Sequence, residues 1–312
     1  MNDHILRVGA RTSRLARAQA GEVMHLLGVS SGLRCEFVGL TTAGDRSPDA
    51  PYSDIGETGV FTREIERALR AGKIDVAVHS LKDLETEFPE GVVMAAVLPR
   101  EDPRDALIVH PGLSDRASLA TLPKGSRVGT ASLRRRALLF RQRSDINVQP
   151  IRGNVPSRLK KLADGEFDAV VLAVAGLNRL GLTNSISEFL APEEFTPAPG
   201  QGAVAVQVRD GDDQTQHAVS GIDHAPTRVA ITAERAFLHR IEGGCQVPAG
   251  ALATITGESL SLIAMICSLD GTRTVRARIQ GPLEHATDIG EQAADQLLRD
   301  GGDSILEEIR AG

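Results

Sequence analysis

One cysteine, one carboxylate and a set of arginines stand in sequence contexts that suggest joint chemistry. Cys245 lies in Gly243-Gly244-Cys245-Gln246-Val247-Pro248, where glycine and proline favour a tight, accessible turn over an apolar core position. Asp83 closes the segment His79-Ser80-Leu81-Lys82-Asp83. The accompanying arginines stand beside glycine-containing segments, and they are Arg134, Arg135, Arg152 and Arg158. An attachable thiol, an acid and several fixed cations predict a covalently held ligand with several negative charges.

Asp83 and Lys82 follow an apolar run, Val76-Ala77-Val78, that is typical of a strand buried on both faces. Open α/β sheets bind their ligands at the carboxyl ends of such strands. A carboxylate at that edge can stabilise a developing positive charge or transfer a proton. The alternative is that the Lys-Asp pair merely begins a solvated turn. His79 is expected to be a hydrogen-bonded strand-end histidine, because no HExxH or Cys/His spacing indicates a metal site.

The other residues of these types have plainer interpretations. A free cysteine is often a small buried hydrophobe, which remains the alternative for Cys245 and is the expectation for Cys267 within Ala264-Met265-Ile266-Cys267. Arg136 and Arg141 are expected on a solvated helix face. Arg135 and Arg152 suit bidentate binding of carboxylates or phosphates near helix N-termini. The sequence has no P-loop, GxGxxG fingerprint or Ser-His-Asp elbow, so nucleotide binding and hydrolysis lack their usual support.

Composition narrows the class of protein. The chain has 312 residues, 41% hydrophobic and 24% charged, enough for two or three soluble domains. A net charge of -6, a pI near 5.8 and the absence of tryptophan argue against nucleic acid or a membrane surface as the partner. The three cysteines lack CxxC spacing, and no apolar run is long enough for a bilayer. The expected location is therefore the reducing cytoplasm.

Two sequence patterns occur twice in the same order. Arg7-Val8-Gly9-Ala10 resembles Arg127-Val128-Gly129-Thr130, and each precedes a helix-like stretch. Downstream, Gly72-Lys73-Ile74-Asp75-Val76-Ala77-Val78 resembles Gly165-Glu166-Phe167-Asp168-Ala169-Val170-Val171. Each of these two segments follows a helix-like stretch. The repeat predicts two similar α/β lobes, each with a strand-to-helix turn whose backbone amides favour anions, and a ligand cleft between the lobes.

Proline and charge at residues 99–105 and 196–202 predict two crossovers between the lobes. The pattern predicts domain 1 at residues 1–100 with 203–220, domain 2 at 105–197 and a smaller α/β domain 3 at 225–312. Domain 3 is expected to begin with a helix at 227–241 and continue with strands within 251–279. A further helix is expected at 61–69, with Ile65, Ala68 and Leu69 buried and Glu66 among the solvent-facing residues.

Seven blocks of residues follow one another along this chain: Arg11-Thr12-Ser13-Arg14-Leu15-Ala16 with Gln19, Thr41-Thr42-Ala43-Gly44-Asp45, Ala77-Val78-His79-Ser80-Leu81-Lys82-Asp83-Leu84, Val128-Gly129-Thr130-Ala131-Ser132-Leu133-Arg134-Arg135, Ile151-Arg152-Gly153-Asn154-Val155, Pro199-Gly200-Gln201-Gly202-Ala203 and Gly243-Gly244-Cys245. In type and order, these blocks resemble those of the porphobilinogen deaminase (hydroxymethylbilane synthase) family across nearly the whole length. The resemblance implies two periplasmic-binding-protein-like lobes with a cleft and hinges, plus a smaller C-terminal α/β domain.

The resemblance also implies the chemistry. A dipyrromethane cofactor would be attached to Cys245 through a thioether, and four porphobilinogen molecules would be condensed head to tail, with loss of ammonia, to give hydroxymethylbilane. Asp83 matches the catalytic carboxylate. The cofactor-binding residues implied are Cys245, Lys82, Asp83, Thr130, Ser132, Arg134, Arg135, Arg152 and Gly153. The substrate-binding residues implied are Arg11, Ser13, Gln19, Arg152, Arg158 and Gln201. A monomer without metal, nucleic acid or membrane partners is expected.

The chain departs from the family pattern at four positions. Glu85 stands where many members continue with proline, and Ala131 replaces a frequent serine. Thr58 stands where lysine is common, and Gln207 where glutamate is usual. Glu85 is the main reason to keep open a homologue that builds the cofactor but turns over poorly. The internal repeat and the arginines alone would equally support a non-enzymatic two-lobed anion binder, which would need neither Cys245 nor Asp83.

Overall fold

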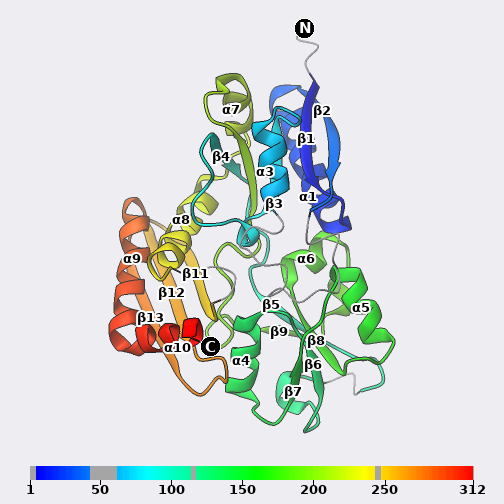
Figure 1. Cartoon of the computed structure of the whole chain (residues 1–312), viewed down its shortest axis with the longest axis vertical. Helices are drawn as coiled ribbons and strands as arrows, with labels where there is room; N and C mark the ends of the chain where they lie inside the picture. Colours follow the sequence, from blue (N-terminus) through cyan, green and yellow to red (C-terminus); the bar gives the residue numbers. More distant parts are fainter. Residues whose placement is uncertain (1–4, 43–61, 114–116, 243–246, 312) are drawn as a thin grey trace. The chain divides into compact units, whose positions relative to one another are not determined.

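The computed structural model describes residues 5–42, 62–113, 117–242 and 247–311 (Figure 1). The chain divides into two compact units. The first comprises residues 1–101 and 202–228, and the second comprises residues 102–201 and 229–312. The chain therefore leaves the first unit, returns to it and leaves it again. The three-domain boundaries expected from the sequence stay a prediction.

A five-stranded mixed sheet forms the centre of the first unit. Its order is β2-β1-β3-β10-β4, in which β2, β1 and β3 are parallel and β10 is antiparallel to β3 and β4. The strands are β1 Ile5–Arg11, β2 Arg34–Leu40, β3 Val76–Ser80, β4 Val92–Val97 and β10 Val204–Arg209. Because β10 belongs to the returning segment, the sheet is complete only when the chain comes back.

Helices cover both faces of this sheet. On one face, α1 Arg14–Ser31 and α7 Asp213–Ser220 pack on the valine side chains of β1, β3 and β10. On the other face, α3 Arg63–Arg70 packs through Ile65 and Leu69. Covering on both faces explains why β3 lacks polar alternation, as the sequence predicted.

The second unit contains a sheet with the same spatial arrangement of strand directions. Its order is β7-β6-β8-β5-β9, with β7, β6 and β8 parallel and β5 antiparallel to β8 and β9. The strands are β5 Asp105–Val109, β6 Arg127–Gly129, β7 Asn147–Gln149, β8 Ala169–Ala173 and β9 Glu188–Leu190. Helix α4 Leu133–Gln142 covers one face, and α5 Val155–Ala163 and α6 Val174–Arg179 pack on the other.

A separate three-stranded antiparallel sheet completes the second unit. It comprises β11 Ala249–Thr256, β12 Ser259–Cys267 and β13 Thr274–Pro282, and it packs with α8 Ala225–Arg240, α9 Ala286–Leu297 and α10 Asp303–Ala311 (Figure 1). Cys267 is fully buried, and its Sγ lies 3.1 Å from the Thr274 Oγ1. The expected α/β class, the smaller C-terminal sheet and the buried position of Cys267 are confirmed.

The internal repeat is confirmed by a matching ion pair in each five-stranded sheet. Arg7 donates from its backbone nitrogen, Nε and Nη2 to the Asp75 carboxylate at 2.7–3.0 Å. Arg127 donates from the same three atoms to Asp168 at 2.7–3.2 Å. Arg7 lies near the start of β1, and Arg127 opens β6. Asp75 directly precedes β3, and Asp168 directly precedes β8.

Glycines at matching positions of the repeat allow close packing. A Cβ on Gly9 would lie 2.4 Å from Ile74 Cδ1, and a Cβ on Gly129 would lie 3.0 Å from Phe167 Cδ1. Ile74 and Phe167 each precede the paired aspartate of their own lobe. Since a side chain at either glycine would collide with a buried neighbour, the repeated glycine is explained by packing.

Asp75→Asn is expected to lower Tm at pH 7, with a loss of about 1.5–3 kcal/mol of unfolding free energy. Burial opposes ionisation of Asp75, but hydrogen bonds from Arg7 and Arg209 lower its pKa to about 2. A carboxyl whose pKa is lower in the folded state stabilises the fold above its unfolded pKa and loses that effect as the pH falls. The Tm difference between wild type and variant should therefore shrink between about pH 4 and pH 2. Thermal unfolding over that range is the measurement, and a constant difference would contradict the expectation.

One expected surface residue is buried instead. Glu66 of α3 is 7% exposed and accepts a hydrogen bond from Gln207 Nε2 at 3.0 Å. Burial raises the pKa of Glu66, and the bond from Gln207 offsets part of this. The prediction that Glu66 faces solvent was wrong because its partner, Gln207, lies in β10, which is distant in sequence from α3. Phe61, expected in the same helix, lies outside the described residues.

Candidate active site

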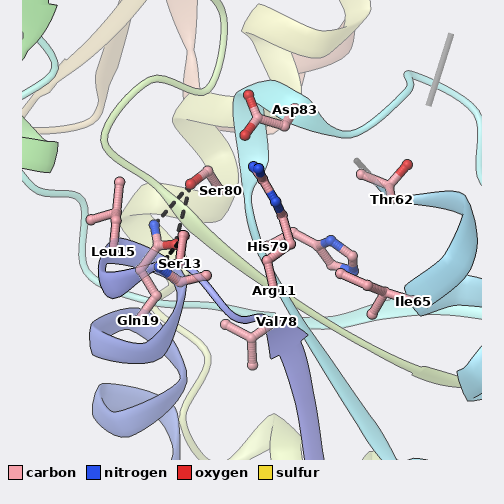
Figure 2. Close-up of a pocket in the computed structure, with 11 residues that line it drawn as sticks. Arg11, Ser13, Leu15, Gln19, Thr62, Ile65, Val78, His79, Ser80 and Asp83 are labelled. Carbon is pink, nitrogen blue, oxygen red and sulfur yellow. Dashed lines mark hydrogen bonds between the residues drawn. The ribbon is translucent and has the colours of Figure 1, made fainter. Parts of the chain in front are cut away.

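A pocket in the first unit lies where β1 and β3 end and α1 begins. Its lining includes charged, polar and apolar side chains: Arg11, Ser13, Leu15, Ala16, Gln19, Thr62, Ile65, Val78, His79, Ser80 and Asp83. Figure 2 shows the Arg11 guanidinium group pointing toward the Asp83 carboxylate. The structure thus brings together four residues expected to bind substrate or to act in catalysis, namely Arg11, Ser13, Gln19 and Asp83.

Asp83 is held by a short 3₁₀ turn, η1 Leu81–Asp83, directly after β3. Leu81 at the start of the turn donates its backbone N–H to the Ala203 carbonyl at 3.0 Å, and Leu84 donates to Leu81 at 3.0 Å. Lys82 and Asp83 are both partly exposed. The strand-end position predicted for this acid is confirmed, and its backbone is fixed by the returning segment that carries Ala203.

Ser13 and Gln19 are placed by α1. Ser13 is the N-cap, and its hydroxyl accepts the backbone N–H of Ala16 at 3.2 Å, which starts the helix beside the pocket. Gln19 is 4% exposed and exchanges hydrogen bonds with the Ser80 hydroxyl at 2.9 and 3.2 Å (Figure 2). Gln19 therefore joins the first turns of α1 to the end of β3.

His79 departs from the expected hydrogen-bonded histidine. It is 5% exposed, and its Nε2 is buried without a hydrogen-bond partner among the described residues. Burial lowers the pKa of His79 to about 4, an effect that the Gln207 side chain only partly offsets. The imidazole is therefore neutral at physiological pH. The expected hydrogen bond is missing at Nε2 within the described ranges.

A second polar group lies in the second unit, at the carboxyl end of β6 and the start of α4. Arg134 and Arg135 are 4% and 6% exposed, and both bind the fully buried carboxylate of Asp105. Burial opposes ionisation of Asp105, but the charges of both arginines and the hydrogen bonds from Arg134 and Gln201 hold its pKa well below the usual range. Asp105 was missed as a site residue, although an acid opening a wholly buried strand was a signal that could have found it.

Thr130 and Ser132 shape the turn before these arginines. Thr130 is 4% exposed, and its hydroxyl accepts the Ser132 backbone N–H at 3.2 Å. Ser132 is the N-cap of α4 and accepts from the Arg135 backbone at 3.4 Å. Arg136 and Arg141 are exposed, as expected. The strand-to-helix turn predicted for this lobe is confirmed.

The remaining predicted cations lie at the end of the neighbouring strand. Strands β6 and β7 are parallel, with Gly129 opposite Gln149, so the segments that follow them begin at the same sheet edge. Gly153 has a φ of 102°, a conformation that favours glycine, and its carbonyl accepts from Arg158 Nε at 2.8 Å. Arg152 and Arg158 are both partly exposed there. Cys245 and Thr58 lie outside the described residues.

The residues in place suit a ligand that carries carboxylates. Arg134 and Arg135 bring one more positive charge than Asp105 neutralises, and Arg134 Nε is buried without a hydrogen-bond partner in the described ranges. Such an excess of buried positive charge favours an anion. The residues expected to hold a dipyrromethane therefore fit this cofactor, because it carries acidic side chains. Over those same ranges, no group of three or more His, Cys, Asp or Glu is placed to hold a metal ion, and no helix is long and apolar enough to cross a membrane.

Duplicated α/β sheets with polar side chains at the carboxyl ends of parallel strands define the general class of this protein: an α/β ligand-binding protein with an internal repeat. Residues 6–217 match the model "Porphobilinogen deaminase, dipyromethane cofactor binding domain", and residues 229–299 match "Porphobilinogen deaminase, C-terminal domain". The chain belongs to the porphobilinogen deaminase family. The family is one of transferases of tetrapyrrole synthesis, and its cofactor is dipyrromethane.

Curated relatives match over nearly the whole chain. Porphobilinogen deaminase of Trichlorobacter lovleyi is 45% identical, covering 97% of this chain and 96% of the relative. The enzyme of Geobacter sulfurreducens is 44% identical, covering 97% and 94%. That of Roseiflexus castenholzii is 46% identical, covering 96% and 98%. Among solved structures, a putative methionine-binding lipoprotein from Bacillus subtilis covers 71% of this chain and 91% of its own at 15% identity, with a TM-score of 0.44 that carries no functional weight.

Glu85→Pro is expected to leave kcat and KM within about twofold of wild type, as for a surface substitution. Glu85 is exposed and does not line the pocket. Leu84 before it is already extended, with φ -84° and ψ 141°, which is the conformation that a following proline requires. Steady-state kinetics with porphobilinogen checks this. A tenfold gain in kcat would instead support a homologue slowed by Glu85.

Proposed function

We propose that this protein condenses four porphobilinogen molecules head to tail, with release of four ammonia molecules, and then adds water to free hydroxymethylbilane for tetrapyrrole and heme synthesis. The observation that carries the proposal is the Asp83 carboxylate facing Arg11 in a pocket at the end of β3, in a chain of this family. The proposal is for a monomeric, cytoplasmic enzyme with porphobilinogen as its small-molecule partner and without a metal, nucleic-acid or membrane partner.

Asp83 is proposed as the catalytic acid and base. Loss of ammonia from porphobilinogen leaves an electron-poor methylene carbon conjugated to the pyrrole nitrogen, so positive charge develops close to the ring N–H. A carboxylate within hydrogen-bond reach of that N–H stabilises the charge and can move a proton to the leaving amine. Arg11, whose guanidinium points to Asp83, is proposed to hold a substrate carboxylate.

Each pyrrole unit carries an acetate and a propionate, which need cationic partners when they leave water. Arg11, Ser13, Gln19, Arg152, Arg158 and Gln201 are proposed to bind substrate in this way. Lys82, Thr130, Ser132, Arg134, Arg135, Arg152 and Gly153 are proposed to hold the acid groups of dipyrromethane. When bound, that cofactor supplies the free pyrrole carbon to which the first substrate unit is joined. Cys245 is the proposed point of attachment, and the cleft and hinges between two periplasmic-binding-protein-like lobes are part of the same proposal.

Incubation of the purified protein with porphobilinogen tests the function. The expected result is consumption of porphobilinogen with release of four ammonia molecules per hydroxymethylbilane. Ammonia and product are measured in the same reaction. Tight binding of porphobilinogen without ammonia release, and without a change in protein mass, would overturn the proposal in favour of a two-lobed anion binder.

A further inference from the structure

The pairing of Arg134 and Arg135 with one internal carboxylate goes beyond the binding roles proposed for them. Asp105 Oδ2 accepts from Arg134 Nη1 at 2.8 Å. Asp105 Oδ1 accepts from Arg135 Nε at 3.0 Å and Nη2 at 2.7 Å. The two guanidinium groups are thus held on the two oxygens of a single side chain, which is itself fully buried.

Each arginine is also fixed by a backbone carbonyl. Arg134 Nη1 donates to the Thr196 carbonyl at 2.7 Å, and Arg135 Nη1 donates to the Val171 carbonyl at 3.0 Å. Each guanidinium group is therefore held both by a backbone carbonyl and by Asp105. Since two adjacent cations repel one another, this arrangement needs the carboxylate between them.

Gln201 links the cluster to two of the three places where the chain passes between the two units. Its Nε2 donates to the Pro103 carbonyl at 2.7 Å and to Asp105 Oδ1 at 2.9 Å. Its Oε1 accepts from Arg135 Nη2 at 3.4 Å. The first passage lies between residues 101 and 102, the second between 201 and 202 and the third between 228 and 229. Asp105 and Gln201 belong to segments beside the first and second passages.

We propose that Asp105 is a positioning residue, which holds the guanidinium groups of Arg134 and Arg135 where they bind the carboxylates of the anionic cofactor. Through Gln201, it also joins them to the segments beside the first two chain passages. The inference rests on the proposed function. Asp105 neutralises one of the two buried charges and leaves the other for the ligand. Without it, two uncompensated guanidinium groups would separate, and the cofactor would lose its fixed partners.

The test compares Asp105→Asn with Asp168→Asn. Asp168 is a matched control because it pairs with Arg127 in the same lobe, before β8, apart from the Asp105 cluster. Both variants are expected to have a lower Tm than the wild-type protein. After incubation with porphobilinogen, intact mass of the folded protein should show at least a fivefold lower cofactor-carrying fraction in Asp105→Asn, whereas Asp168→Asn should load like wild type. Loading equal to wild type in folded Asp105→Asn, or equal losses in both variants, would overturn the proposal.

Asp105→Glu provides a second variant that keeps the negative charge. If Asp105→Asn does not fold, a lower loaded fraction in folded Asp105→Glu than in Asp168→Asn supports the inference, and equal loading overturns it. Where both variants at position 105 fold, better loading of the glutamate variant is expected. Wild-type protein is assayed for turnover in parallel. Absence of turnover in the wild-type protein would count against the proposed function. Normal wild-type turnover, together with wild-type cofactor loading in the Asp105 variants, would count against this inference alone.

Discussion

Asp83→Asn is expected to lower kcat for porphobilinogen by about 10²–10⁴-fold, the range of a lost general acid or base. The side chain is partly exposed and ends a short turn whose backbone bonds do not involve its carboxylate, so the fold should be retained. The amide has nearly the same shape as the carboxylate but can neither take up a proton nor balance a positive charge. Steady-state kinetics and thermal unfolding, measured on the same preparation, separate the catalytic loss from a folding defect.

Glu85→Gln is the matched control for Asp83→Asn. It removes one negative charge two residues farther along the chain, from an exposed side chain that does not line the pocket. Its kcat should stay within about twofold of wild type. A similar fall in both variants would point to general loss of negative charge near the pocket, and near-normal turnover of Asp83→Asn would remove this residue from the mechanism.

Cys245→Ala is expected to abolish the covalent cofactor and, with it, turnover. The intact mass of denatured wild-type protein should exceed the mass of its sequence by two pyrrole units, because a thioether survives denaturation. The variant should show the sequence mass alone. An unmodified wild type that gains the two units on incubation with porphobilinogen would have been apo-protein, whereas one that never gains them would contradict covalent attachment.

Cys267→Ala is the control for the cysteine prediction. Cys267 is fully buried beside Thr274, and burial raises the pKa of its thiol, which disfavours the reactive thiolate. This variant should keep both the mass excess and its turnover, although it loses a buried contact. Loss of the excess in Cys267→Ala, with retention in Cys245→Ala, would move the attachment point to the buried thiol.

The amino-acid sequence was enough to predict the repeated strands, the turns that follow them and the position of Asp83. These features depend on short-range patterns: uninterrupted apolar runs for strands covered on both faces, serine caps before helices, and polar residues at strand ends. The repeat could be seen because Arg7 and Asp75 match Arg127 and Asp168 in order as well as in type.

The pairing of side chains that are distant in sequence could be learned only from the folded chain. Gln207 reaches Glu66 because β10 returns to lie between β3 and β4 in the first sheet. Glu66 is therefore buried, although the helical pattern predicted that it faces solvent. Asp105 meets Arg134, Arg135 and Gln201 because β5 lies beside β8 in the second sheet, with its first residue near the start of α4. Local sequence sets backbone conformation within a few residues, but pairing of buried charges depends on how the whole chain closes, since only the assembled core removes the water that would otherwise solvate them.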